Sequence, residues 1–443
     1  MSRATVVRVL VGALLLAGSL GAVAQQKSLY SVEEYNAYVD TTRGEPAERL
    51  TAIDAFLKNY PNSILRALIY PAQAQLAFSV KQYEKAMGAA DAYLAMDRDQ
   101  VNNILNQSGY NELQIEGTYY SSILTHSSSY LQLMGTNAAR AQALTENAAR
   151  TARRGLELHD RIYAQVQAPT DPAQLQQFQA QKQQAEATFR VILADAAWRS
   201  KDWPTSAKQY TVLVGYTPND AALNYRLGLS YLQSQPPQWE KGLWHVARSV
   251  ALNISKAEEV KDFLSKNVAA YQQVLPECSQ DQVDDLVAQA ALSPNPPAGW
   301  RLVSSEQVSS VRNELTLKRI FDDLKAGGEQ EQMIWLASCG LELPELEAEV
   351  VQISQNEGNV VTLGVAVTAE SSEAKKADMV VRVISPPEAK NVKVGDLVHI
   401  TGTLRAYQKD PEFQLVLDNG RIKPEDIPRT RGGRGGAGRG GSR

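Results

Sequence analysis

The chain has 443 residues, of which 44% are hydrophobic and 21% charged, a composition typical of globular proteins with room for two or three domains. Its formal charge of −4 excludes a global basic field that would attract nucleic acid. The charge is unevenly distributed along the chain. The last 15 residues carry five Arg and no acidic residue, which leaves a formal charge of −9 on the rest.

The first 24 residues are typical of a secretory signal peptide. Arg3 and Arg8 precede an apolar run from Val9 to Ala22, and Ala22-Val23-Ala24 offers a small-x-small cleavage site. The run is shorter than the roughly 20 residues that a membrane span needs, which favours cleavage after Ala24 over the alternative of a retained anchor. No later segment is long and apolar enough to span a membrane. We therefore expect a periplasmic or secreted protein.

Helical periodicity follows from Ser31 to about Ala291. Pro61-Asn62-Ser63 separates two amphipathic helices, and another helix starts at Tyr83. The pattern then predicts helices from Tyr110 to Leu133 and from Ala138 to about Gln165. Thr170-Asp171-Pro172 is typical of the start of a further helix.

The clearest pattern lies between Asp202 and Asn253. Trp203-Pro204 opens one helix, Leu227-Gly228-x-x-Tyr231 lies in the next, and Trp239 opens a third. Small residues let antiparallel helices approach closely, aromatic residues fill the space beside them, and Pro218 marks the turn. The pattern resembles a tetratricopeptide (TPR) repeat, and the segment around Tyr83 is a weaker second unit. Because one such unit leaves a face uncovered, the resemblance implies an α-solenoid of repeats over residues 28–292.

The resemblance also implies a partner-binding surface on the concave side of the solenoid. Four residues are expected to approach that side: Trp198, Tyr225, Leu229 and Leu232. The alternative for each of them is packing against a neighbouring helix. The Lys/Asn pattern with which chaperone-binding TPR proteins hold a carboxylate is not evident, so the partner is predicted only as a protein or peptide.

The helical repeats end at Ser293–Gly299, where three Pro in seven residues cannot propagate a helix. A short helical stretch from Ser305 to about Ser338, broken at Gly327-Gly328, follows. Residues 293–344 are therefore interpreted as a linker and helical connector.

From Leu346 the hydrophobic period changes to two, which is typical of strands. The predicted strands cover residues 347–353, 360–367, 379–384, 397–404 and 413–417, with turns at Asn356-Glu357-Gly358 and Asp418-Asn419-Gly420. Five short strands predict a small β-barrel at residues 345–424. The stretch Val394-Gly395-Asp396-Leu397-Val398-x-Ile400-x-Gly402 resembles OB-fold domains, in which Gly-Asp turns into a strand and the later Gly permits sharp curvature. The predicted fold class is thus mainly α, a TPR-like α-solenoid followed by a small five-stranded OB-like β-barrel.

Residues 425–443 are predicted to form a disordered Gly/Arg tail. Arg431-Gly432-Gly433-Arg434 resembles the RGG boxes of RNA-binding proteins, in which Arg contacts phosphates and bases. The signal peptide, the acidic body and the scarcity of barrel aromatics, Tyr407 and Phe413, speak against nucleic acid as the partner.

The sequence contains no phosphate-binding loop, no G-x-S-x-G motif and no H-E-x-x-H motif. His126 precedes Ser127, but adjacency in sequence does not make a catalytic triad. Two Cys and four scattered His lack metal-ligand spacing, so no catalytic, cofactor or metal site is predicted. Cys278 and Cys339 either form a disulfide or remain free thiols.

Together these patterns predict a non-catalytic scaffold of the bacterial cell envelope that holds a protein or peptide partner. The alternative is a module that binds an extended polymer, nucleic acid or cell-wall glycan, through the barrel and the Arg/Gly tail.

Overall fold

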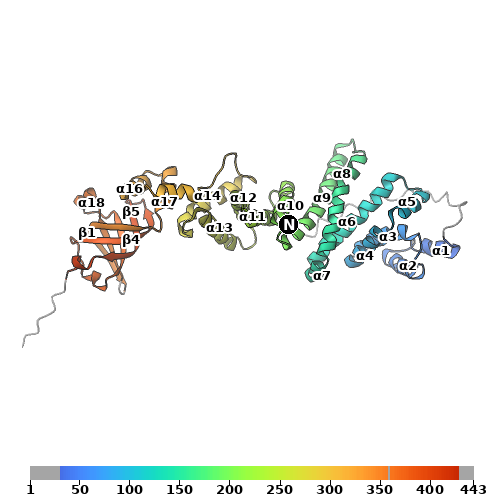
Figure 1. Cartoon of the computed structure of the whole chain (residues 1–443), viewed down its shortest axis with the longest axis horizontal. Helices are drawn as coiled ribbons and strands as arrows, with labels where there is room; N and C mark the ends of the chain where they lie inside the picture. Colours follow the sequence, from blue (N-terminus) through green and yellow to red (C-terminus); the bar gives the residue numbers. More distant parts are fainter. Residues whose placement is uncertain (1–29, 358–359, 429–443) are drawn as a thin grey trace, which may run out of the picture. The chain divides into compact units, whose positions relative to one another are not determined.

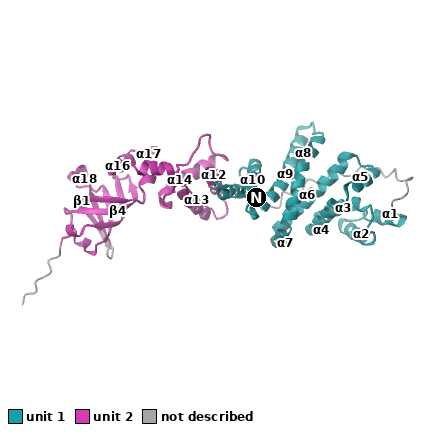
Figure 2. Cartoon of the chain, viewed as in Figure 1, with its two compact units in different colours: residues 1–238 teal, residues 239–443 magenta. Residues whose placement is uncertain are grey.

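The computed structural model describes residues 30–357 and 360–428, and the chain divides into two compact units, residues 1–238 and 239–443 (Figure 2). The described chain is mainly α-helical and ends in a closed five-stranded β-barrel, which confirms the predicted fold class (Figure 1). The predicted signal peptide and the Arg-rich residues 429–443 lie outside the described residues.

The described part of the first unit is helical. Its helices are α1 (Val32–Asp40), α2 (Pro46–Asn59), α3 (Arg66–Ser79), α4 (Tyr83–Leu94), α5 (Arg98–Gln107), α6 (Glu112–Thr136), α7 (Ala138–Ala143), α8 (Thr145–Gln165), α9 (Pro172–Arg199), α10 (Trp203–Tyr216) and α11 (Ala221–Gln233).

Capping residues explain where several of these helices begin. The Asp171 side chain accepts a hydrogen bond from the backbone N–H of Gln174, and Pro172 occupies the first turn, as predicted for this helix start. Asp202 caps α10 in the same way through Thr205, directly before Trp203 and Pro204. Local hydrogen bonds from the capping Asp therefore explain why α9 and α10 begin at the Asp and Pro residues of the sequence.

The predicted helix from Ala138 to Gln165 is wrong in its continuity. It is divided into α7 and α8 at Leu144, a one-residue turn (φ −101°, ψ 0°) whose backbone N–H bonds the Ala141 carbonyl, three residues back, at 3.0 Å. The buried Thr145 side chain is held at this break between the Ala141 carbonyl, at 3.3 Å, and the Tyr130 hydroxyl, at 2.9 Å. A tertiary contact with α6 therefore accompanies a break that helical periodicity does not reveal.

Close packing of small against aromatic residues holds the middle of this unit together. Phe189 of α9 and Ile123 of α6 are fully buried against Gly155 of α8. A Cβ atom on Gly155 would lie 2.6 Å from the Phe189 ring and 2.9 Å from Ile123. The three helices approach as closely as they do because this position has no side chain.

The second unit begins with three helices and a short 3-10 turn and continues through three more helices. They are α12 (Trp239–Ala251), α13 (Ala257–Gln272), η1 (Pro276–Ser279), α14 (Gln280–Leu292), α15 (Ser305–Arg312), α16 (Leu317–Ala326) and α17 (Gly328–Ser338). The Pro-rich segment after α14 is non-helical, as predicted. The connector has one further break, between α15 and α16.

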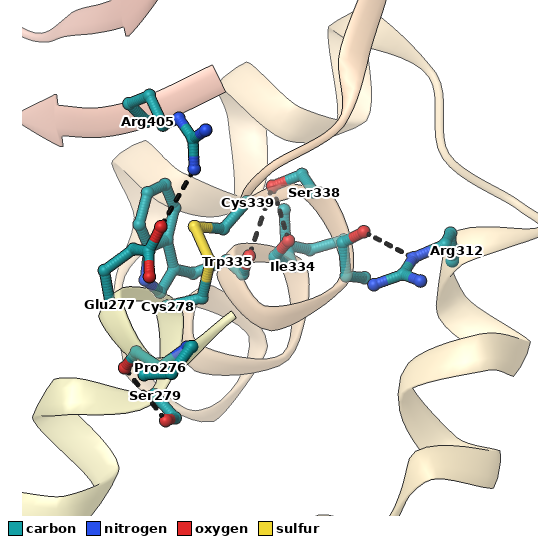
Figure 3. The surroundings of a disulfide bond; sticks show 11 residues. Pro276, Glu277, Cys278, Ser279, Arg312, Ile334, Trp335, Ser338, Cys339 and Arg405 are labelled. Atoms are coloured by element: carbon teal, nitrogen blue, oxygen red, sulfur yellow. Dashed lines mark hydrogen bonds and ion pairs between the residues drawn. A yellow bond between two sulfur atoms is a disulfide. The ribbon is translucent and has the colours of Figure 1, made fainter. Parts of the chain in front are cut away.

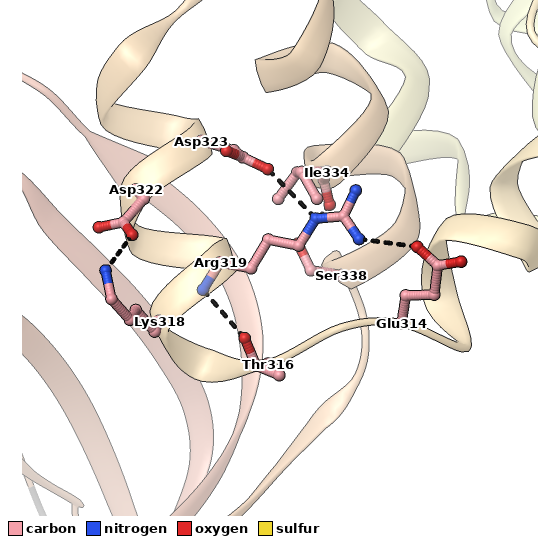
Figure 4. A network of polar contacts seen from close by, with 8 residues as sticks. All are labelled: Glu314, Thr316, Lys318, Arg319, Asp322, Asp323, Ile334 and Ser338. Carbon is pink, nitrogen blue, oxygen red and sulfur yellow. Dashed lines mark hydrogen bonds and ion pairs between the residues drawn. The ribbon is translucent and has the colours of Figure 1, made fainter.

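A polar network sets this second break (Figure 4). The Thr316 hydroxyl caps α16 by accepting the backbone N–H of Arg319. The Arg319 guanidinium then bonds Glu314, before the helix, at 3.1 Å and Asp323, one turn later, at 3.4 Å. The contacts join the loop after α15 to the first turns of α16.

A disulfide joins Cys278 in η1 to Cys339 at the end of α17, and both residues are buried (Figure 3). The pairing that the sequence left open is therefore formed. Beside it, Arg405 of the barrel bonds Glu277 at 2.9 Å, and Arg312 donates to the Ala337 carbonyl at 3.0 Å. The disulfide and the Arg405–Glu277 contact fasten the helices before the Pro-rich segment to the chain after it, and the Arg312 contact joins α15 to α17.

The barrel strands are β1 (Glu342–Glu357), β2 (Val360–Ala366), β3 (Met379–Ser385), β4 (Leu397–Gln408) and β5 (Gln414–Ile422). They close in the order β1-β2-β3-β5-β4, with β1 paired to β4 and a parallel β3–β5 pair. Gly395, at φ +94°, makes the tight turn before β4, as predicted. Gly402 packs against Leu417 where the β4–β5 register shifts, which fits its predicted role in curvature.

Three features of the barrel differ from the prediction. The predicted turn Asp418-Asn419-Gly420 is wrong, because these residues lie inside β5, where its register with β3 shifts. Asn419 adopts φ +55° there, so the turn-like residues make a β-bulge. A helix between β2 and β3, α18 (Ala369–Ala374), was not predicted. After β5 the chain adds the 3-10 turn η3 (Pro424–Asp426), and Asp426 bonds His399 at 2.9 Å.

The connector helices belong to the barrel core. Phe321 and Leu324 of α16 and Ile334 of α17 share one hydrophobic cluster with the inward residues of the strands. The two aromatic residues of the barrel face these helices, with Phe413 5.7 Å from Phe321 and Tyr407 5.0 Å from Trp335, between ring centroids. The barrel therefore gains its apolar cover from residues that precede it in the chain.

Candidate partner-binding surface

The four predicted partner-binding residues lie on two helices of the first unit. Trp198 is in the last turn of α9, and Tyr225, Leu229 and Leu232 are in α11. Helix α10 lies between these helices in sequence and packs against both.

Trp198 belongs to a half-exposed cluster with two residues that were not predicted as site residues. Its ring meets the Trp203 ring edge-on, with centroids 5.1 Å apart. The Arg226 guanidinium of α11 lies over the Trp198 ring, 4.4 Å from its centroid. We refer to Trp198, Trp203 and Arg226 as the tryptophan–arginine patch, which brings together the end of α9, the start of α10 and the middle of α11.

The other three predicted residues lie on a different face of α11. At 100° per residue, Tyr225, Leu229 and Leu232 share one side of the helix. The opposite side, with Leu227 and Ser230, faces α10. Leu232 is buried, whereas Tyr225 and Leu229 are half-buried. The structure therefore groups these three residues with one another and Trp198 with the patch.

Hydrogen bonds join the three helices that carry the patch. The hydroxyls of Ser206 and Ser230, both fully buried, lie 2.9 Å apart between α10 and α11. On the α9 side, Glu186 bonds Arg190 and accepts the Tyr216 hydroxyl at 2.6 Å. These hydrogen bonds hold the pKa of Glu186 below its ordinary value even though burial opposes them. The Ser206–Ser230 contact lies about one helical turn from Trp203 and Arg226, whereas Glu186 and Tyr216 join α9 to the opposite end of α10.

The charge of the patch is positive. Arg226 is exposed, and within the described residues its guanidinium forms no ion pair with a carboxylate. Lys201 is also exposed, in the turn between the two tryptophans, whereas Arg199 is neutralised by Asp195 at 2.6 Å. Burial raises the pKa of the nearby Tyr210 to about 12, so this hydroxyl adds no negative charge at neutral pH. The patch thus combines two aromatic surfaces with an unneutralised guanidinium.

Of the three patch residues, the sequence predicts only Trp198 as a site residue. Trp203 belongs to the repeat motif, and its position in the first turn of a capped helix is a signal for exposure. No sequence pattern marks Arg226 as a site residue, because its place in the patch depends on contact with the Trp198 ring of another helix.

The remaining polar chemistry is dispersed. Across residues 30–357 and 360–428, His, Cys, Asp and Glu do not gather in a group of three that could hold a metal ion. His126 is fully buried, and its Nε2 lies 3.3 Å from an oxygen of Asp91. In the barrel, the Tyr407 hydroxyl donates to Glu331 at 2.7 Å, so both barrel aromatics are engaged with α16 and α17.

No family model matches the chain, and a search of curated proteins finds no similar sequence. In the described part of the chain, every helix is too short or too polar to cross a lipid bilayer.

Proposed function

We propose that the chain is an exported, non-catalytic scaffold that holds an acidic peptide segment of a cell-envelope protein at the tryptophan–arginine patch. The observation that carries the proposal is the Arg226 guanidinium stacked on Trp198, for which the described part of the chain supplies no carboxylate partner. Trp and Arg are the residues most enriched among those that dominate protein interfaces. A carboxylate of the partner would pair with Arg226 while its apolar side chains cover the indole rings.

We further propose that α10 and α11 are parts of a TPR-like array. Small residues, Ser206 and the buried Gly228, lie where the helices are close, and Tyr210 fills space beside them. This small-against-aromatic packing is what the repeat pattern requires. The resemblance rests on these residues and on the motif.

Two observations support export. The N-terminal sequence has the charge, apolar run and cleavage site of a signal peptide. The Cys278–Cys339 disulfide is of a kind that persists in oxidising compartments and is rare in the cytosol. We infer a periplasmic or secreted location.

Site-specific crosslinking in the native cell tests the proposal. A photo-crosslinking residue in place of exposed Lys201 would be combined with Arg226→Gln or Trp203→Ala, and adducts would be identified by mass spectrometry. We expect one dominant envelope protein, linked through a segment rich in Asp or Glu, and at least about a ten-fold loss of adduct in each variant.

The matched control is Arg199→Gln, which removes an exposed guanidinium of α9 that is already paired with Asp195. It should leave the adduct unchanged. Adducts that persist in Arg226→Gln and Trp203→Ala, or that carry no acidic segment, would contradict the proposal.

The alternative, binding of a nucleic acid or cell-wall glycan by the barrel and the tail, has less support. The observation in its favour is that two arginines on neighbouring strands, Arg382 of β3 and Arg421 of β5, are exposed, although Arg382 already lies 3.5 Å from Asp418. Base stacking needs free aromatic faces, but Tyr407 and Phe413 pack against the connector helices. Oligonucleotide binding that falls steeply with salt and is lost on deletion of residues 429–443 would favour this alternative.

A further inference from the structure

A small pocket lies in the first unit between the end of α4 and helices α5 and α6. Its floor consists of buried residues, and half-buried residues form its rim. The floor residues are Tyr93, Val101, Ile115 and Tyr119, and the rim residues are Met96, Arg98 and Asn102. The pocket is independent of the tryptophan–arginine patch on α9–α11.

Three polar atoms of this pocket have no hydrogen-bond partner in the described part of the chain. They are the hydroxyl oxygens of Tyr93 and Tyr119 and the side-chain oxygen of Asn102. Tyr93 is 1% exposed and Tyr119 5% exposed, so bulk water does not satisfy their hydroxyls. A buried hydroxyl without a partner is costly, and the three side chains that carry these atoms line one pocket, which indicates a common binding partner.

These groups can all donate. Burial raises the pKa of the Tyr93 hydroxyl well above its ordinary value, which keeps its proton in place at neutral pH. Turning the Asn102 amide about its last bond would present its NH₂ group to the pocket in place of the oxygen. The pocket therefore suits an atom that accepts hydrogen bonds from several sides.

The surrounding charge is positive. The guanidiniums of Arg98 and Arg154 lie 4.2 and 4.4 Å from the centroid of the Tyr119 ring. Glu116 neutralises part of this charge, because it pairs with Arg98 and also accepts from Arg161 at 2.7 Å. Glu116 thus serves two of the three guanidiniums, whereas Arg154, near Glu157, forms no ion pair within the described part of the chain. The two guanidiniums over the Tyr119 ring favour an anion at the rim.

The size of the pocket limits the ligand. The enclosed space is about 10 Å³, roughly what one water-sized group occupies. A planar carboxylate can place one oxygen inside such a space and leave the other at the rim, whereas a sulfate or phosphate ion is too large to enter.

We propose that this corner of α4, α5 and α6 binds a carboxylate group. One oxygen accepts hydrogen bonds from the Tyr93 and Tyr119 hydroxyls and from the Asn102 amide. The other oxygen stays at the rim beside the Arg98 guanidinium. The group comes either from a small free carboxylic acid or from an acidic end or side chain of a peptide.

Formate is the probe of choice, because it is the smallest carboxylate. The mature chain, residues 25–443, would be titrated with sodium formate and sodium acetate against sodium chloride at equal ionic strength, followed by NMR of the tyrosine rings and by thermal unfolding. We expect saturable shifts of Tyr93 and Tyr119 and a rise in melting temperature with the carboxylates alone.

Tyr93→Phe and Tyr119→Phe should each weaken formate binding at least about ten-fold, because each removes one donor to a charged acceptor. Both variants should fold, since the lost hydroxyl has no partner within the described chain. Tyr130→Phe is the matched control on α6: its hydroxyl bonds Thr145 at 2.9 Å, outside the pocket, and its loss should leave formate binding unchanged.

Peptides identify the source of the carboxylate. A short peptide with a free C-terminus tests binding of a chain end, and the same peptide with one internal Asp and an amidated C-terminus tests binding of a side chain. The amidated peptide without Asp is the control, and binding of formate without either peptide would indicate a small free acid. The proposal is overturned if formate has no more effect than chloride, or if Tyr93→Phe and Tyr119→Phe bind formate as tightly as the unmodified chain. Loss of the envelope crosslink in Arg226→Gln bears only on the tryptophan–arginine patch, so the two proposals can fail separately.

Discussion

Gly155 shows how much a single missing side chain contributes to the first unit. A methyl group there would lie 2.6 Å from Phe189 and 2.9 Å from Ile123, both fully buried and unable to move away freely. We expect Gly155→Ala to lower the free energy of unfolding by about 1–3 kcal/mol in urea titrations followed by circular dichroism.

Gly117→Ala in α6 is the matched control for this substitution. An added Cβ meets nothing within 4 Å there, so only the helix preference of Ala remains. The control should be neutral or stabilising by up to about 1 kcal/mol. Equal effects of the two substitutions would show that close packing at Gly155 is not what matters.

His245 of α12 gives the second unit a dependence on pH. Burial lowers its pKa from the ordinary 6.5 to about 4, because the folded environment disfavours the charged ring. The unfolded chain takes up the proton first as pH falls. Stability from this group is therefore complete above pH 6.5 and is lost as the pH falls from 6.5 to about 4, by about 3 kcal/mol in all.

NMR titration of the His245 imidazole is the direct measurement. We expect its midpoint well below 6.5, and we expect His245→Gln to lose less stability between pH 7 and pH 4.5 than the unmodified chain. A midpoint at or above 6.5 would contradict the assignment of the acid sensitivity to this residue.

Single residues also show which parts of the two candidate sites cannot be predicted from the sequence. Trp198 can be predicted as a site residue because a large aromatic residue at a repeat position is visible in the sequence itself. The patch needs Arg226, which lies 28 positions later and is indistinguishable in sequence from any solvated helix charge. The unpaired hydroxyls of Tyr93 and Tyr119 were equally invisible, since burial and missing partners are three-dimensional properties.

At the scale of elements, the disulfide is the strongest single constraint in the second unit. It links residues 61 positions apart, and closing a loop of that size in the unfolded chain corresponds to about 4 kcal/mol of stabilisation. We expect the double variant Cys278→Ala, Cys339→Ala to unfold at a lower temperature than the oxidised chain.

Thermal unfolding with and without a reducing agent checks this expectation. The reductant should have no effect on the double variant, which has no disulfide. On the oxidised chain it should act slowly, because both residues are buried. If the reduced chain and the oxidised chain melted together, the disulfide would be dispensable for stability.

The sequence predicted most elements correctly because their signals are local. Capping at Asp171 and Asp202, the proline-rich segment after α14 and the two-residue period of the strands all act within a few residues. The misses have tertiary causes. The break at Leu144 accompanies contact of Thr145 with Tyr130, and the residues Asp418-Asn419-Gly420 form a bulge because β5 adjusts to β3.

At the scale of the whole molecule, the leader and the disulfide make a joint prediction about processing. We expect protein recovered from its native cell to begin at Gln25 and to have both thiols oxidised. Production without residues 1–24 in a reducing cytosol should give the reduced form.

Intact mass before and after alkylation measures both properties at once. Protein from the native cell should have the mass of residues 25–443 less two hydrogens and should resist alkylation until it is reduced. A mass that includes the leader would favour the retained anchor instead.

The disulfide also determines how the chain would carry a mechanical load. If the two ends of the chain were pulled apart, the tension would pass through the disulfide from Cys278 to Cys339 and would bypass the residues between them. About 200 Å of potential extension is thereby withheld, because extended chain adds at most about 3.5 Å per residue. Stretching in a single-molecule experiment should release this length only after reduction. A cut in the bypassed segment would likewise leave the barrel tethered to the helices before it.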